Sequence, residues 1–191
     1  IFVTSSGSNA VRVLDISNIS NPTLVASLVE TTRLAAAGRF AFDGSYMYIL
    51  ATNHLTIVNT TTPTSPVIQG FLQDSTNLSS PTSVAINGNY AYVAASGRLV
   101  VVNITNKSSP TLVTSLVNAS FSQCKGTFAS GNYVYLACDN FFGIVDVTTP
   151  ASPTLISSLT DSNYYYGGNG IAVYGNYAYF SADATYGGAI I

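Results

Sequence analysis

The chain has 191 residues, of which 47% are hydrophobic and only 7% are Asp, Glu, Lys or Arg, with a formal net charge of −2. Charged residues make up about 25% of a typical soluble protein. The six basic residues are scattered, so no basic stripe is available to neutralise a phosphate backbone. No apolar run approaches the ~20 residues of a membrane-spanning helix. We therefore expect neither a nucleic-acid partner nor a membrane span.

Ser, Thr and Asn provide the polarity that charges provide in most proteins. This composition is typical of secreted and cell-surface proteins, in which attached glycan supplies hydration. We expect an extracellular or cell-surface location. Because Ile1 is not an initiator Met and no signal peptide follows it, we also expect the beginning of the gene product to be missing.

Along the chain, a turn-and-strand motif of the form Gly-x-Tyr-x-Tyr begins at Gly44, Gly88, Gly131 and Gly175, at intervals of 43 or 44 residues. A glycine before a strand of alternating tyrosines indicates a two-residue hairpin turn. Tyr90 and Tyr92, two residues apart on a strand, lie on one face, and we expect them to pack against a neighbouring sheet with their hydroxyls at polar edges.

Two further motifs keep this period. A short polar residue ends an apolar strand, where its side chain is suited to an Asx turn, and a proline seven residues later begins the next strand. The polar residues are Asp15, Asn59, Asn103 and Asp146, and the prolines are Pro22, Pro66, Pro110 and Pro153.

Each period contains four strand-forming runs and no helical periodicity, which predicts an all-β protein with no helix longer than two turns. In the second full repeat the predicted strands are 82–87, 90–95, 99–104 and 111–116. Four antiparallel strands per 43–44 residues are typical of a β-propeller blade with the first strand nearest the axis.

In chain order, residues 1–28 form a partial blade without a first strand, and residues 34–72, 78–116 and 122–159 form full blades. Residues 168–191 form a partial blade without a fourth strand. Since both ends carry strands two and three, they cannot complete one shared blade. We expect residues 1–191 to be one array from a longer repeat protein, with its edge strands filled by further blades of the same chain or by another copy.

The segments 88–94, 99–105 and 109–113 carry a resemblance to a known family. They read Gly-Asn-Tyr-Ala-Tyr-Val-Ala, Leu-Val-Val-Val-Asn-Ile-Thr and Ser-Pro-Thr-Leu-Val, and the chain resembles the LVIVD-repeat family in all of its repeats. The resemblance implies a β-propeller of a secreted or surface protein. It transfers no active-site residues, because the shared residues belong to the frame of the fold.

The two cysteines, Cys124 and Cys138, would face each other if the hairpin turned about Gly131. Other blades have small residues at both places, so this paired change favours a disulfide and an oxidising compartment over the alternative of two buried thiols. A metal or redox site would need further ligands or a CxxC motif, which are absent.

Six Asn-x-Ser/Thr sequons occur, a small excess over chance. The predicted glycan acceptors are Asn18, Asn77, Asn106 and Asn118. Asn77 and Asn118 lie in loops between blades and are the stronger candidates. The sequons at Asn59 and Asn103 have another explanation, because these residues occupy the Asx-turn position.

His54, the only histidine, has no carboxylate beside it in sequence, and the acids are scattered. We therefore predict no catalytic residue, no metal site and no cofactor. The loop with Tyr164, Tyr165 and Tyr166 is a candidate surface for carbohydrate or protein; the alternative is packing against the adjacent blade.

These features favour a non-enzymatic extracellular structural repeat protein, a building block of a surface layer, appendage or fibre. The expected partners are other copies of the chain, or further blades, and carbohydrate. The alternative is a ligand-binding or adhesive propeller domain of a secreted or cell-surface protein. A propeller hydrolase or lyase is a third reading, and it would require acids or a histidine converging on a central pocket.

Overall fold

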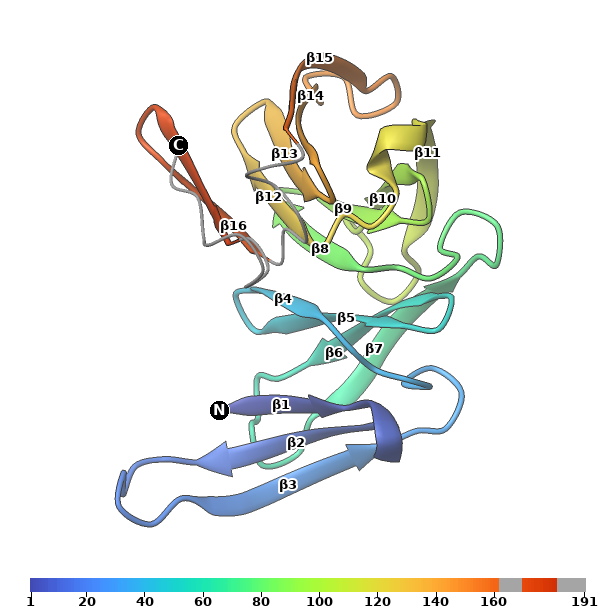
Figure 1. The fold of residues 1–191 in the computed structure, drawn as a ribbon. Helices are drawn as coiled ribbons and strands as arrows, with labels where there is room; N and C mark the ends of the chain where they lie inside the picture. The colour runs from blue at the N-terminus through green and yellow to red at the C-terminus, as the bar shows by residue number, and fades with distance from the viewer. Residues whose placement is uncertain (162–169, 182–191) are drawn as a thin grey trace.

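The computed structural model describes residues 1–161 and 170–181, which form five antiparallel sheets. We number these sheets blades 1 to 5 (Figure 1). Blade 1 contains β1 (Phe2–Ser5), β2 (Ala10–Asp15) and β3 (Thr23–Val29). Blade 2 contains β4 (Phe40–Asp43), β5 (Tyr46–Ala51), β6 (His54–Asn59) and β7 (Val67–Gln73). Blade 3 contains β8 (Ser83–Asn87), β9 (Tyr90–Ala95), β10 (Arg98–Asn103) and β11 (Thr111–Val117).

Blade 4 contains β12 (Gly126–Ser130), β13 (Tyr133–Cys138), β14 (Phe141–Asp146) and β15 (Thr154–Thr160). Blade 5 contains β16 (Gly170–Tyr174) and β17 (Tyr177–Ser181).

The strands of blade 3 start and end within a residue of the predicted bounds. In the described residues the helices are the short 3₁₀ turns η1 (Ser6–Ser8) and η2 (Ala119–Phe121). None of the helices in that part of the chain is long and apolar enough to cross a membrane.

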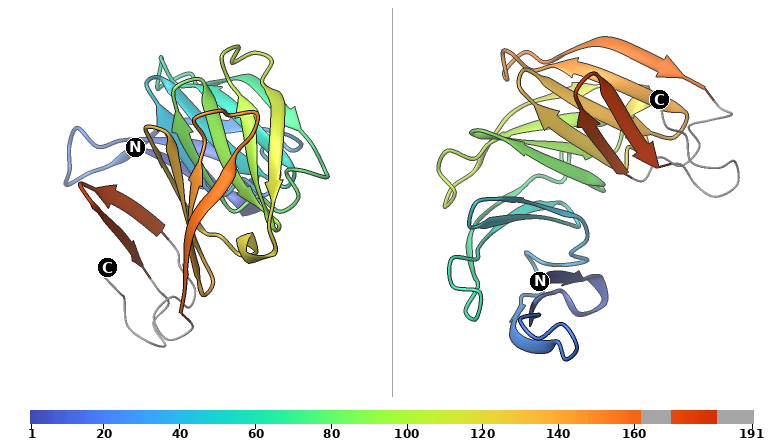
Figure 2. Two further views of the ribbon diagram at one scale, coloured as in Figure 1. Left: turned by 90° about the horizontal axis from the view of Figure 1, so that it is seen from above. Right: turned by 90° about the vertical axis from the view of Figure 1, so that its left-hand side faces the viewer.

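The blades follow one another around an open arc (Figures 1 and 2). The first strands lie side by side on the inner side of the arc, with β8 between β4 and β12, and β16 on the other side of β12. The prediction that the first strand of a blade is nearest the axis is confirmed for blades 2 to 5, whereas blade 1 lacks this strand. The fourth strand of each full blade, β7, β11 or β15, forms the outer edge of its sheet.

Every full blade is a simple meander, so its connections fall at two opposite ends. At one end, which we call the hairpin end, the turn between strands one and two is hydrogen-bonded to the loop between strands three and four. Ile104 N–H donates to Asn89 O over 2.9 Å, for example. At the other end, the junction end, the turn between strands two and three bonds to the loop leading to the next blade. Asn118 N–H donates to Gly97 O over 3.0 Å there.

The predicted hairpin turns occur at all four glycines, each with φ between 55° and 58°. In the turn of blade 3, Asn87 pairs with Tyr90, so the two loop residues are Gly88 and Asn89. Only the glycine has a positive φ, which L-residues with a side chain rarely adopt. The predicted Asx turns are also present. Each side-chain oxygen accepts a backbone N–H over 2.8–2.9 Å, at Asp15, Asn59, Asn103 and Asp146.

The cores lie between neighbouring blades. The second tyrosine of the repeat motif faces the following blade, and its side chain is 0% exposed at Tyr48 and 2% at Tyr92. Tyr48 Oη is buried without a hydrogen-bond partner, and burial raises the pKa of this phenol to about 12. The position therefore contributes to the fold through its ring rather than its hydroxyl.

Blades 2 and 3 also interlock at the hairpin end. The loop of blade 3 passes so close to β7 that a Cβ on Gly70 would lie 2.7 Å from the carbonyl of Ser108. Gln69 Nε2 donates to Ser108 Oγ over 2.6 Å, and Lys107 Nζ lies 5.0 Å from the ring centre of Tyr46. A side chain at position 70 would separate the two blades.

Candidate functional site

In the described residues we find no group of side chains arranged as a catalytic centre. His54 is 3% exposed, and neither ring nitrogen has a hydrogen-bond partner. Burial lowers its pKa, which favours the neutral imidazole. Across residues 1–161 and 170–181, no three His, Cys, Asp or Glu side chains are grouped to hold a metal ion. The features that differ between blades lie instead at the junction end and the hairpin end.

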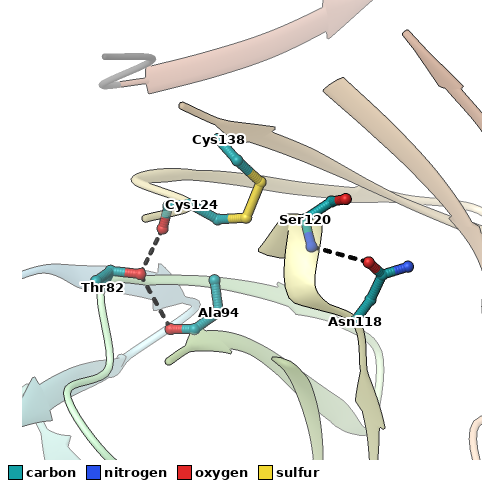
Figure 3. The surroundings of a disulfide bond; sticks show 6 residues. All are labelled: Thr82, Ala94, Asn118, Ser120, Cys124 and Cys138. Atoms are coloured by element: carbon teal, nitrogen blue, oxygen red, sulfur yellow. Dashed lines mark hydrogen bonds between the residues drawn. A yellow bond between two sulfur atoms is a disulfide. The ribbon is translucent and has the colours of Figure 1, made fainter. Parts of the chain in front are cut away.

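The first three loops between blades each begin with an acceptor side chain that caps the loop. A Glu30 carboxylate oxygen accepts from the backbone N–H groups of Thr32 and Arg33. Asp74 Oδ1 accepts from Thr76 and Asn77 over 2.9 and 2.8 Å, which lowers the pKa of Asp74. Asn118 Oδ1 accepts from Ser120 over 2.9 Å (Figure 3). Sequence analysis did not identify these caps, although their 44-residue spacing repeats like the other motifs.

Below the cap, the type of side chain that fills the junction differs from blade to blade. In blade 2 the guanidinium of Arg33 lies 5.1 Å from the ring centre of Phe71, and that ring lies 5.9 Å from His54. In blade 3 the equivalent positions carry Asn77, Arg98 and Ser115 and form hydrogen bonds instead. In blade 4 they include Phe121 and Phe141, with ring centres 5.9 Å apart.

The hydrogen bonds of the blade 3 junction are made by Asn77, one of the predicted glycan acceptors. Asn77 Nδ2 donates to Asp74 Oδ2 over 2.8 Å. Asn77 Oδ1 accepts from Arg98 Nη1 over 3.2 Å and from Ser115 Oγ over 2.9 Å. Asn77 stays a predicted acceptor, but in the folded blade the amide nitrogen that would carry a glycan is hydrogen-bonded within the junction. Asn118 uses only its oxygen for capping.

The blade 4 junction contains the disulfide. Cys124 and Cys138 are bonded, as predicted, and each residue is 1% exposed. Thr82 Oγ1 of blade 3 donates to the carbonyl oxygens of Cys124 and Ala94, so the same loop is also tied to the preceding blade (Figure 3). The bond therefore fixes the loop where the cores of blades 3 and 4 meet.

The predicted pairing of the two cysteines was off by one residue. The turn contains Gly131 and Asn132, so Ser130 pairs with Tyr133 and Gly126 pairs with Ala137. Cys124 consequently precedes β12 and is not a ladder partner of Cys138. The loop that precedes β12 nevertheless places Cys124 close enough to Cys138 for the sulfur atoms to bond.

The hairpin end presents exposed, hydroxyl-rich loops. Asn18 and Asn106 are exposed there, and their Oδ1 atoms accept from Ser20 and Ser108 over 3.1 Å. Their Nδ2 atoms make no hydrogen bond within the described residues. Of the four predicted acceptors, these two are exposed, whereas Asn77 and Asn118 are half-buried.

The outward faces of blades 1 and 5 are apolar. Val3 is 41% exposed, whereas Met47, its equivalent in blade 2, is 0% exposed under blade 1. Tyr179 is 39% exposed, whereas its equivalents Tyr48 and Tyr92 are covered by the following blade. Between blade 4 and blade 5 lies a cleft of about 530 Å³, with an aromatic lining that includes Tyr135, Phe142, Tyr177 and Phe180. The predicted loop of Tyr164, Tyr165 and Tyr166 lies outside the described residues.

Solved structures share this architecture at low sequence identity. A functionally unknown protein from Desulfotomaculum acetoxidans superposes with a TM-score of 0.75 at 14% identity, over 95% of this chain and 59% of its own. A protein from Lactobacillus plantarum gives 0.75 at 12% identity, over 96% and 61%. A Bacteroides fragilis protein described as a candidate 6-phosphogluconolactonase gives 0.70 at 10% identity, over 83% and 51%. The chain spans about 60% of the first two, and at these identities the likeness shows the fold alone.

No curated protein matches the chain. The LVIVD repeat matches residues 6–30, 36–74, 77–117, 125–161 and 168–185, which together make up most of the sequence. Each segment covers strands of one of the five successive sheets of a partial β-propeller, with β1 lying before the first match. The chain therefore belongs to the LVIVD repeat family.

Proposed function

We propose that this chain is a non-enzymatic extracellular structural repeat protein, a building block of a surface layer, appendage or fibre. The observation that carries the proposal is the apolar outer face at each end of the array. Val3 and Leu24 are 41% and 56% exposed on blade 1, and Tyr177 and Tyr179 are exposed on blade 5. The inner-blade equivalents of Val3 and Tyr179, such as Met47 and Tyr48, are buried by a neighbouring sheet. Another blade of the same kind, from the same polypeptide or from another copy, would cover these faces in the same way.

Two further features support an extracellular location. A disulfide persists in oxidising compartments and is rare in the cytosol. The low share of charged residues fits a surface that is hydrated by glycan or buried in an assembly. Within residues 1–161 and 170–181, the amide nitrogens of the predicted acceptors Asn18, Asn106 and Asn118 make no hydrogen bond.

Sedimentation velocity of the purified chain tests the assembly. We expect association that increases with concentration and that is reduced by Val3→Lys and by Tyr179→Lys, because a charge would be buried at the contact. Val117→Lys is the matched control, since Val117 is 66% exposed on an inner blade. A chain that stays monomeric at every concentration, also in material isolated from cells, would contradict assembly through these faces.

The aromatic cleft between blades 4 and 5 favours a second candidate, a ligand-binding or adhesive propeller domain. Tyrosine and phenylalanine rings are suited to stacking on a sugar face or on an apolar side chain of a protein. Saturation-transfer NMR with a panel of oligosaccharides tests it. Transfer to a sugar that is lost in Tyr177→Ala and retained in Tyr133→Ala would favour this function, and no transfer to any sugar would argue against a carbohydrate ligand.

A further inference from the structure

The loop between strands three and four contains a β-turn at the same place in each of the first four blades. The backbone N–H of the fourth turn residue donates to the carbonyl oxygen of the first over 2.8–3.1 Å. The four turns are 18–21, 62–65, 106–109 and 149–152. Their first residues are Asn18, Thr62, Asn106 and Thr149. All four are exposed at the hairpin end.

The chemistry at this position alternates along the array. Blades 1 and 3 have asparagine within an Asn-x-Ser sequon, at Asn18 and Asn106. Blades 2 and 4 have threonine directly before proline, at Thr62 and Thr149. A proline at the second position of the turn fixes φ there and restricts the preceding threonine to an extended conformation. Both residue types are acceptors for glycan, asparagine through nitrogen and threonine through oxygen.

The threonine hydroxyls have no role in holding the turn. In the asparagine blades, the side-chain oxygen accepts the N–H of the third turn residue and so supports the loop. Thr62 and Thr149 make no side-chain hydrogen bond in the part of the chain that the structure describes. Thr60, two residues from Thr62, is buried and donates its hydroxyl to Ser45 O over 2.8 Å. Thr148, beside Thr149, donates its backbone N–H to Asp146 Oδ1 over 2.8 Å.

The surrounding loops have the composition of O-glycosylated segments, which are rich in serine, threonine and proline. Residues 60–66 read Thr-Thr-Thr-Pro-Thr-Ser-Pro, and residues 148–153 read Thr-Thr-Pro-Ala-Ser-Pro. Neither loop contains a charge. Attached sugar would supply the hydration that the missing charges would otherwise provide.

We propose that Thr62 and Thr149 are O-glycosylation sites, so that the hairpin end of the array carries a row of glycans at one equivalent position per blade. The inference rests on the extracellular location of the proposed function. In the transfer step, the threonine Oγ–H bond breaks and an Oγ–C1 bond to the sugar forms. The C1–O bond to the diphosphate of a nucleotide- or lipid-linked sugar donor breaks at the same time. The diphosphate leaves with the electron pair, and the hydroxyl proton goes to a base of the transferase.

Site-resolved mass spectrometry of the protein isolated from the cells that produce it tests this proposal. After proteolysis, electron-transfer fragmentation assigns sugar mass to single residues. We expect hexose-type mass on Thr62 and Thr149 and none on Thr60, whose hydroxyl is buried and hydrogen-bonded. In intact protein, Thr62→Val and Thr149→Val each remove the mass of one glycan, while Thr60→Val leaves the glycan mass unchanged.

Two outcomes would overturn the proposal in different ways. Unmodified Thr62 and Thr149 in a secreted, disulfide-bonded protein would refute the sites while leaving the structural function in place. Protein that is retained in the cytosol with free thiols and no sugar would refute both. Sugar spread equally over Thr60 and Thr62 would also refute it, because selection by exposure and hydroxyl freedom would then be absent.

Discussion

Removing the disulfide should destabilise the array by a predictable amount. The bridge joins residues 14 apart. The loss of chain entropy on closing a loop of about 15 residues is worth about 3 kcal/mol of stability. The variant Cys124→Ala/Cys138→Ala matches a natural solution, because blade 2 has buried Ala37 and Ala51 at the same places. We therefore expect the cost to come mainly from the lost cross-link rather than from misfolding.

Thermal unfolding followed by circular dichroism measures this cost. For a chain of this size, about 3 kcal/mol corresponds to a fall in Tm of roughly 6–12 °C. Reductant should lower the Tm of the unmodified protein by a similar amount and leave the double-alanine variant unchanged, which is the control for other effects of the reductant. Equal Tm values for the oxidised protein and the variant would refute the argument that the bridge holds the junction of blades 3 and 4.

Three further predictions concern single positions. Tyr48→Phe should stabilise the protein by about 1 kcal/mol in urea unfolding, because it removes a buried hydroxyl that has no partner. His54 has a lowered pKa in the fold, so the unfolded chain binds its proton more readily; stability should fall as the pH drops below about 6.5, and His54→Phe should remove this part of the decrease. A pH profile that is the same for both proteins would contradict that assignment. Gly70→Ala should destabilise by about 1–3 kcal/mol because its Cβ would meet the backbone of Ser108, whereas Gly7→Ala, with open space around it, should be nearly neutral.

The sequence was sufficient to predict the strands and turns that repeat in each blade. Turn glycines such as Gly88, Asx residues such as Asn103 and prolines such as Pro110 act through their own backbone or through a neighbour within two residues. Such local effects repeat wherever the motif repeats. The period therefore predicted the strand order, the hairpin turns and the bounds of the strands in blade 3.

Contacts between elements could not be predicted in the same way. Asn77 resembles a loop sequon until Arg98 and Ser115, 21 and 38 residues later, are brought beside it. The exact register around Gly131 depends on how many residues the turn contains, which the motif alone does not specify. The shared role of Asn18, Thr62, Asn106 and Thr149 became visible only when the backbone turns of four blades were compared.

Cryo-electron microscopy of the protein isolated from the cell surface tests the structural function most directly. We predict density for a further β-sheet packed on Val3 and Leu24 of blade 1, and for another on Tyr177 and Tyr179 of blade 5. Continuous connections to those sheets would assign them to the same polypeptide, and repeating units would assign them to other copies. Isolated particles in which both apolar faces are bare would contradict the account.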